Sequence, residues 1–151
     1  MPAQLRSQTF IRHFIRQRGL LALFIALPLA GCILSTEQQA KRQELRQLAA
    51  ETPKFPDFEQ TDYSDIVKSS KVVVTYFYRS SASYEDVKSF YTKALLSQGW
   101  SSPQEERLTK WFDQDGSRRL IFRKGKHTIY INYEADKASS WRFAVDYDWE
   151  A

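Results

Sequence analysis

The stretch Trp141–Trp149 constrains the fold of this chain more than any other. Aromatic or aliphatic side chains stand at every second position, and Arg142, Ala144, Asp146 and Asp148 alternate with them. Successive side chains of a β-strand point to opposite faces, so this alternation predicts a strand with one face in a core and the other outside it. The chain therefore needs a sheet of which one face is buried.

Further strands are expected on both sides of a single helix. Lys71–Arg79 is β-branched and aromatic on both faces, which favours a strand inside the sheet. Residues 57–70 are expected to be irregular, with a short strand at Tyr63–Val67 as the alternative. Turn residues separate three more candidate strands, Leu108–Asp113, Arg118–Arg123 and His127–Glu134.

The helix between these strands begins after Ser83, whose side chain is expected to cap it together with Asp86, and reaches about Gln98. Its apolar face has helical spacing and consists of Val87, Phe90, Tyr91, Ala94 and Leu95. We expect this face to pack on the Trp141–Trp149 stripe. The resulting fold class is α+β, an antiparallel sheet of about five strands with one helix packed on one face, in the order β-α-β-β-β-β.

The content of aromatic residues separates this domain from the segment that precedes it. No aromatic residue lies between Cys32 and Lys54, whereas 19 of the 97 residues from Phe55 onward are aromatic. Glu37–Ala50 is rich in helix formers, with Thr36 and Gln39 as the expected N-cap and capping-box pair. We expect a polar helical tether; the alternative is a helix that binds a partner through Leu45, Leu48 and Ala49. The predicted domains are residues 1–31, 32–54 and 55–151.

The first 32 residues carry a targeting pattern. Arg6, Arg12, Arg16 and Arg18 precede an apolar run that ends in Leu29, Ala30, Gly31 and Cys32. A retained membrane helix is the alternative, but Pro28 and Gly31 interrupt the run.

The sequence Leu29-Ala30-Gly31-Cys32 resembles the lipobox of bacterial lipoproteins. The resemblance implies cleavage between Gly31 and Cys32, and lipid on the Cys32 thiol and the new amino terminus. It also implies a lipoprotein of the bacterial cell envelope that faces the periplasm. Ile33 after the cysteine would favour the outer membrane in a Gram-negative cell.

A second resemblance covers about residues 70–150. This part of the chain is similar to small periplasmic and lipoprotein domains. The similarity lies in the order of its parts: a strand, a serine-capped helix with Phe90 and Tyr91, then Leu95, Gly99 and Trp100, and finally a run of strands. In outline, the layout is also similar to the helix-grip domains of an outer-membrane assembly lipoprotein. This resemblance implies a fold and transfers no catalytic residue.

Charge and cysteine content exclude several classes of function. The chain has 22 Lys+Arg and 18 Asp+Glu, and four of the arginines lie in the segment expected to be removed, so the mature chain is balanced. Net charge therefore gives no argument for nucleic acid or for general attraction to an anionic membrane. Cys32 is the only cysteine, and its lipidation would leave no thiol for a disulfide or a metal site.

The candidates for chemistry are few. We expect His127 to be structural or solvated. Asp146, Asp148 and Glu150 are expected to lie on a solvent-exposed face of the last strand. The alternative for these three carboxylates is a cation site or acid–base chemistry. Arg118, Arg119, Arg123, Lys124 and Lys126 could bind an anionic partner or protect a sheet edge. We expect no catalytic residue, metal or cofactor.

The functional expectation is a non-catalytic, lipid-anchored envelope protein that binds or scaffolds another envelope protein. The expected partner site is the sheet face away from the helix, with Thr128, Tyr130, Asn132 and Arg142. One alternative is a lipid or glycan carrier, which a cavity between Phe90, Tyr91 and the Trp141–Trp149 stripe would favour. A cell-wall-acting enzyme is the second alternative, which carboxylates facing each other across a cleft would favour.

The lipobox predicts the behaviour of one variant. Cys32→Ser should leave an uncut precursor that incorporates no labelled fatty acid, because the thiol that accepts the lipid is missing. Gel mobility and metabolic labelling measure both effects. Normal cleavage and labelling of this variant would refute the assignment.

Overall fold

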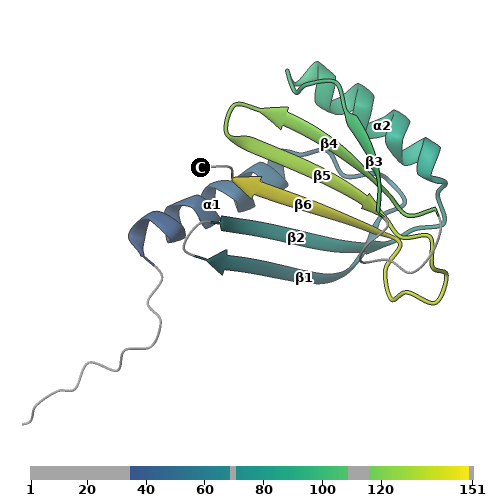
Figure 1. The fold of residues 1–151 in the computed structure, drawn as a ribbon, viewed down its shortest axis with the longest axis horizontal. Coiled ribbons are helices and arrows are strands. Elements are labelled where there is room, and N and C mark those ends of the chain that lie inside the picture. Colours follow the sequence, from purple (N-terminus) through teal and green to yellow (C-terminus); the bar gives the residue numbers. More distant parts are fainter. Residues whose placement is uncertain (1–34, 69–70, 109–115, 150–151) are drawn as a thin grey trace, which may run out of the picture. The chain divides into compact units, whose positions relative to one another are not determined.

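The computed structural model describes residues 35–68, 71–108 and 116–149 (Figure 1). These residues form two helices and six strands: α1 (Thr36–Glu51), β1 (Glu59–Lys68), β2 (Lys71–Arg79), α2 (Tyr84–Ser97), β3 (Gln104–Arg107), β4 (Arg118–Lys124), β5 (His127–Tyr133) and β6 (Phe143–Trp149). The strands make one antiparallel sheet in the order β1-β2-β6-β5-β4-β3. The fold class is therefore α+β, as predicted.

Alternation divides the sheet into two faces, and both helices pack on the same one (Figure 1). On β6, Phe143, Val145 and Tyr147 join the core, together with side chains at alternate positions of β2, β4 and β5. The opposite face, here called the outer face, carries the residues between them. Neither helix of the described part of the chain covers the outer face.

Helix α2 forms as its sequence predicts. The Ser83 hydroxyl accepts a hydrogen bond from the backbone N–H of Asp86 at 3.1 Å, which satisfies a free donor at the helix start. Gly99, with a φ of 82°, ends the helix, and the N–H of Trp100 turns back to the Leu95 carbonyl.

The apolar face of α2 enters the core as expected. Val87, Tyr91 and Leu95 are almost completely buried, but Phe90 lies at the rim, where its ring meets Phe55 edge-on at 5.3 Å.

Helix α1 corrects the prediction of a polar tether and a single packed helix. Leu45 is fully buried in the core, and Leu48 and Ala49 pack against it. The polar side chains also bind the domain: Arg46 donates to Tyr63 and Asp65 on β1, each at 2.9 Å. The interpretation failed because these polar residues make tertiary contacts instead of facing water on all sides.

The N-cap of α1 lies one residue earlier than predicted. Ser35, not Thr36, accepts from the Gln38 backbone N–H at 3.2 Å, and the Gln38 side chain accepts from the Ser35 N–H at 3.1 Å. Thr36 and Gln39 have the same spacing, so the sequence pattern alone did not distinguish the two capping boxes.

Two strands differ from their predicted bounds. The sheet continues before Leu108, because the polar segment Gln104–Arg107 pairs with β4 as an edge strand; positions 109–113 lie outside the described residues. The strand given as the alternative at Tyr63–Val67 is present and longer, from Glu59 to Lys68, and pairs with β2 along its length. Both segments pair with the sheet through backbone hydrogen bonds, although neither has the alternating apolar side chains that identify a strand in the sequence. With them, the sheet has six strands.

The burial of Leu45 yields a stability prediction. Leu45→Ala should lower the free energy of unfolding by about 2–5 kcal/mol, because a fully buried side chain leaves a cavity. Leu96→Ala on α2 is the control: this leucine is 43% exposed, so the change should stay within about 0.5 kcal/mol. Urea unfolding measures both, and equal midpoints for the two variants would show that α1 adds nothing to the core.

Candidate functional site

The outer face carries three of the four side chains expected to bind a partner. Thr128, Tyr130 and Asn132 alternate with the core residues Ile129 and Ile131 along β5. Thr128 and Asn132 are only 1% and 4% exposed, whereas Tyr130 is half-buried. Of these three, Tyr130 offers the most surface to a partner.

Arg142 is not on the sheet face where alternation placed it. It precedes the start of β6, and its guanidinium donates to the Glu134 and Ala135 carbonyls at 2.8 and 3.1 Å and to the Tyr133 hydroxyl. The Arg142 backbone still bonds to Tyr78 and Glu134, but these side-chain contacts hold the guanidinium at the end of β5 instead of on the outer face.

A polar network holds the middle of the outer face in place. Arg119 Nε donates to Asn132 Oδ1 at 2.6 Å, and Asn132 Nδ2 donates to Asp146 Oδ2 at 2.9 Å. The Arg119 guanidinium lies 4.9 Å from the centre of the Tyr130 ring, which is within cation–π range. Three neighbouring strands are thus joined by side chains.

The two carboxylates of β6 are less exposed than predicted: Asp146 is half-buried and Asp148 is buried. Burial raises the pKa of Asp146, although hydrogen bonds from Asn132 and Thr75 favour its charged form. Asp148 is 4% exposed and lies 2.8 Å from Lys71 Nζ. Both carboxylates belong to the same face of one strand, so they do not oppose each other across a cleft. Glu150 lies outside the described residues.

A hollow of about 610 Å³ borders the far end of the outer face, where β2 ends and β6 begins. Trp141, Arg79 and Arg142 line it, together with Asp57 and residues of the β5–β6 loop. Trp141 also packs against Phe77 of the outer face with ring centres 5.6 Å apart. Tryptophan, tyrosine and arginine are the residues most enriched at the energetic centres of protein interfaces.

A second, smaller hollow lies on the helix side. It measures about 250 Å³ and is lined by the end of α1 and by four tyrosines, Tyr76, Tyr78, Tyr91 and Tyr147. Burial raises the pKa of Tyr78 to about 12. This hollow is smaller than the roughly 300–1,000 Å³ of usual ligand pockets.

His127 is structural, in agreement with the prediction. It shares the core side of β5 with Ile129, and its Nε2 lies 2.9 Å from the Glu44 carboxylate of α1. The histidine therefore links the sheet to a helix that sequence reasoning had placed outside the domain.

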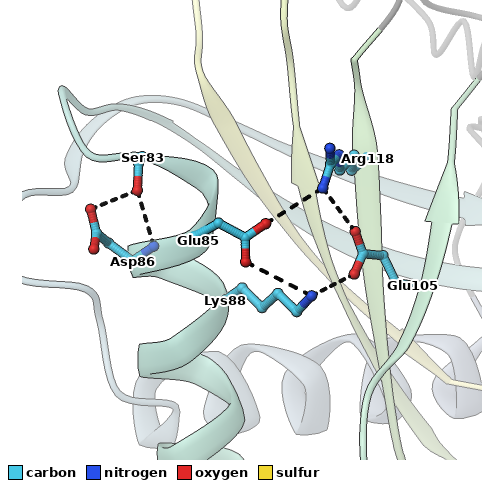
Figure 2. A network of polar contacts seen from close by, with 6 residues as sticks. All are labelled: Ser83, Glu85, Asp86, Lys88, Glu105 and Arg118. Atoms are coloured by element: carbon cyan, nitrogen blue, oxygen red, sulfur yellow. Dashed lines mark hydrogen bonds and ion pairs between the residues drawn. The ribbon is translucent and has the colours of Figure 1, made fainter.

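The basic residues around the β4–β5 hairpin do not form one patch. Figure 2 shows Arg118 between two carboxylates, 3.5 Å from Glu85 of α2 and 3.2 Å from Glu105 of β3. Lys88 completes the network at 2.6 Å from Glu105, and the hydrogen bond from Lys88 lowers the pKa of that carboxyl. These contacts attach the β3 edge to α2. Arg119 faces the opposite side of the sheet, and Lys124 and Lys126 lie at the hairpin.

The lipobox residues, including Gly31 and Cys32, lie outside the described residues. In the described part of the chain, no helix has the length and apolarity needed to cross a bilayer. Within the same ranges, no three His, Cys, Asp or Glu side chains converge as metal ligands would.

The fold defines a small α+β domain in which an antiparallel sheet packs two helices on one face. Comparison with known families matches residues 60–139 to the family described as START domain-like. The match spans more than half of the chain, so the chain belongs to the START domain-like family. Searches of the curated proteins and of the solved structures each found no match.

The raised pKa of Asp146 predicts how stability depends on pH. The folded chain favours the neutral carboxyl, so folding takes up a proton between the ordinary pKa near 3.9 and the raised folded value. The contribution of Asp146 to stability is therefore greatest below this window and falls as the pH rises through it.

Asp146→Asn should remove this part of the pH dependence, because the amide stays neutral and can still accept from Asn132. We expect the variant to be at least as stable as the parent at pH 7, and to gain relative to it as the pH rises from about 4. Asp148→Asn is the control and should lose stability at pH 7, since it breaks the pair with Lys71. Urea unfolding at several pH values measures this; an Asp146→Asn variant that loses stability relative to the parent as the pH rises would contradict the assignment.

Proposed function

We propose that this protein is a non-catalytic lipoprotein of the bacterial cell envelope that binds another envelope protein through its outer face. The observation that carries the proposal is the Arg119–Asn132–Asp146 network, which fixes a sheet face that neither described helix covers. A surface held in one arrangement loses little conformational freedom on binding. The lipobox resemblance at Cys32 supports the location.

The composition of the outer face supports a protein as the partner. Tyr130 and Phe77 are half-buried on it, and the hollow at its far end adds Trp141 and two arginines. Acidic and basic groups alternate around that hollow, for example Asp57 and Arg79. Aromatic anchors surrounded by a polar rim are typical of protein interfaces.

A lipid or glycan carrier is the second candidate. The tyrosine-lined hollow on the helix side supports it, since Tyr91 and Tyr147 belong to the region where such a cavity was expected. Phe90, however, does not line that hollow. The volume of about 250 Å³ is below that of usual ligand pockets, so this hollow supports the candidate only weakly. An enzyme acting on the cell wall receives no comparable support from the two β6 carboxylates.

Tyr130→Ala tests the partner site in the lipidated chain. The variant should keep the circular dichroism and melting of the parent but lose the envelope proteins that co-purify from native membranes, because the aromatic surface beside Arg119 is removed. Tyr130→Phe keeps the ring and should retain much of the binding. Lys93→Ala, at an exposed position of α2, should change neither fold nor binding. A folded Tyr130→Ala variant with its full set of partners would exclude this face.

A further inference from the structure

One end of the sheet gathers lysines from three strands. The register places Lys68 of β1 opposite Lys71 of β2, and it aligns the start of β2 with Trp149 of β6 and His127 of β5. Lys124 pairs with His127 across the β4–β5 hairpin, and Lys126 follows in the turn. We call the set Lys68, Lys71, Lys124 and Lys126 the lysine end; all four residues are exposed.

The lysine end is basic although the mature chain is balanced. Glu44 lies 3.5 Å from Lys126 and also contacts His127, and Asp148 pairs with Lys71 at 2.8 Å. Among the described residues, no carboxylate lies within ion-pair distance of Lys68 or Lys124. Among the described residues named here, the four lysines are accompanied by two carboxylates, Glu44 and Asp148.

Helix α1 begins at this same end of the sheet (Figure 1). The Gln38 side chain donates to the Lys68 carbonyl at 3.0 Å, and Lys41 Nζ lies 3.8 Å from the centre of the Trp149 ring. Lys126 is also close to that ring, at 4.7 Å. The first two turns of α1 are thus anchored to the lysine end.

The length of chain before α1 limits how far the lysine end can lie from a lipid on Cys32. Three residue steps separate Cys32 from the N-cap Ser35, and a fully extended chain spans at most about 3.6 Å per step. Ser35 therefore cannot lie more than about 11 Å from the Cα atom of Cys32. Lys68, whose carbonyl accepts from Gln38 in the first turn of α1, is the member of the lysine end that lies near Ser35. The Debye length at physiological salt is about 8 Å, so the charge of a membrane surface acts on a lysine only when it comes that close.

We propose that the lysine end docks on anionic phospholipid headgroups at the membrane that holds the lipid anchor. This inference rests on the proposed lipidation of Cys32 and adds an orientation to it. The strands then point away from the bilayer, and the outer face stands upright with its far end furthest from the lipid.

Amine-labelling rates of individual lysines test the docking on the full lipidated chain. The chain is placed in vesicles of phosphatidylcholine alone, or of phosphatidylcholine mixed with phosphatidylglycerol. Labelling of Lys71 and Lys126 should be several-fold slower on the anionic vesicles, while the exposed Lys93 and Lys137 keep their rates. About 1 M NaCl, which shortens the Debye length to about 3 Å, should remove the protection.

A matched pair of double variants identifies the charges responsible. Lys68→Gln with Lys124→Gln removes two lysines that are outside the described ion pairs, and should restore fast labelling of Lys71 and Lys126 on anionic vesicles. Lys93→Gln with Lys137→Gln makes the same change in charge elsewhere and should leave the protection intact.

The outcomes separate docking from anchoring. A parent chain that floats with the vesicles but labels at equal rates on both compositions overturns the docking and leaves the lipid anchor standing. A chain that does not float overturns both. Protection found in native membranes but absent from the anionic vesicles would indicate a protein at the lysine end, and would also overturn the proposal.

Discussion

The pairing of the last strand with two distant partners is the constraint on which the rest of the structure depends. Strand β6 lies in the middle of the sheet and pairs with β2 on one side and β5 on the other. Its odd-numbered residues complete the core, and its even-numbered residues complete the polar network of the outer face. A shift of one residue would exchange the two sets, burying Asp146 in the core and exposing Val145.

Placing both helices on one face has opposite consequences for the two sides of the sheet. The helix side has ample apolar surface, because α1 adds Leu45 to the residues of α2. The outer face has no described helix to cover it and instead combines small residues, such as Thr128 and Ala144, with longer polar side chains that bind one another. Asp146 is half-buried in this arrangement, and Asn132 and Thr75 supply hydrogen bonds to it.

Sequence reasoning succeeded where a local pattern sets the structure. The alternation from Phe143 to Trp149 and the Ser83 cap each depend on neighbouring residues, and the structure contains both. It failed where the deciding contact is distant. Helix α1 is mostly polar, and it joins the core because Leu45, Leu48 and Ala49 meet the sheet.

The same distinction holds for the candidate site. Alternation placed Tyr130, Thr128 and Asn132 on the correct face of β5, because that strand is regular. It could not show that Arg119 and Asp146 would occupy the polar groups of Asn132, since those residues meet only when β4, β5 and β6 pair. The hollow beside Trp141 combines residues from separate segments, so no single stretch of sequence indicates it.

The two proposals together imply a direction of approach for the partner. Strand β6 runs from Phe143, near the hollow, to Trp149 at the lysine end, and a strand of this length spans roughly 20 Å. If the lysine end meets the headgroups, the hollow with Trp141 and Arg142 lies about that far from them. A partner that binds there would approach from the side of the domain away from the anchored end. The outer face would extend from this contact toward the membrane, so one partner could contact both Trp141 and Tyr130 without displacing the lysine end.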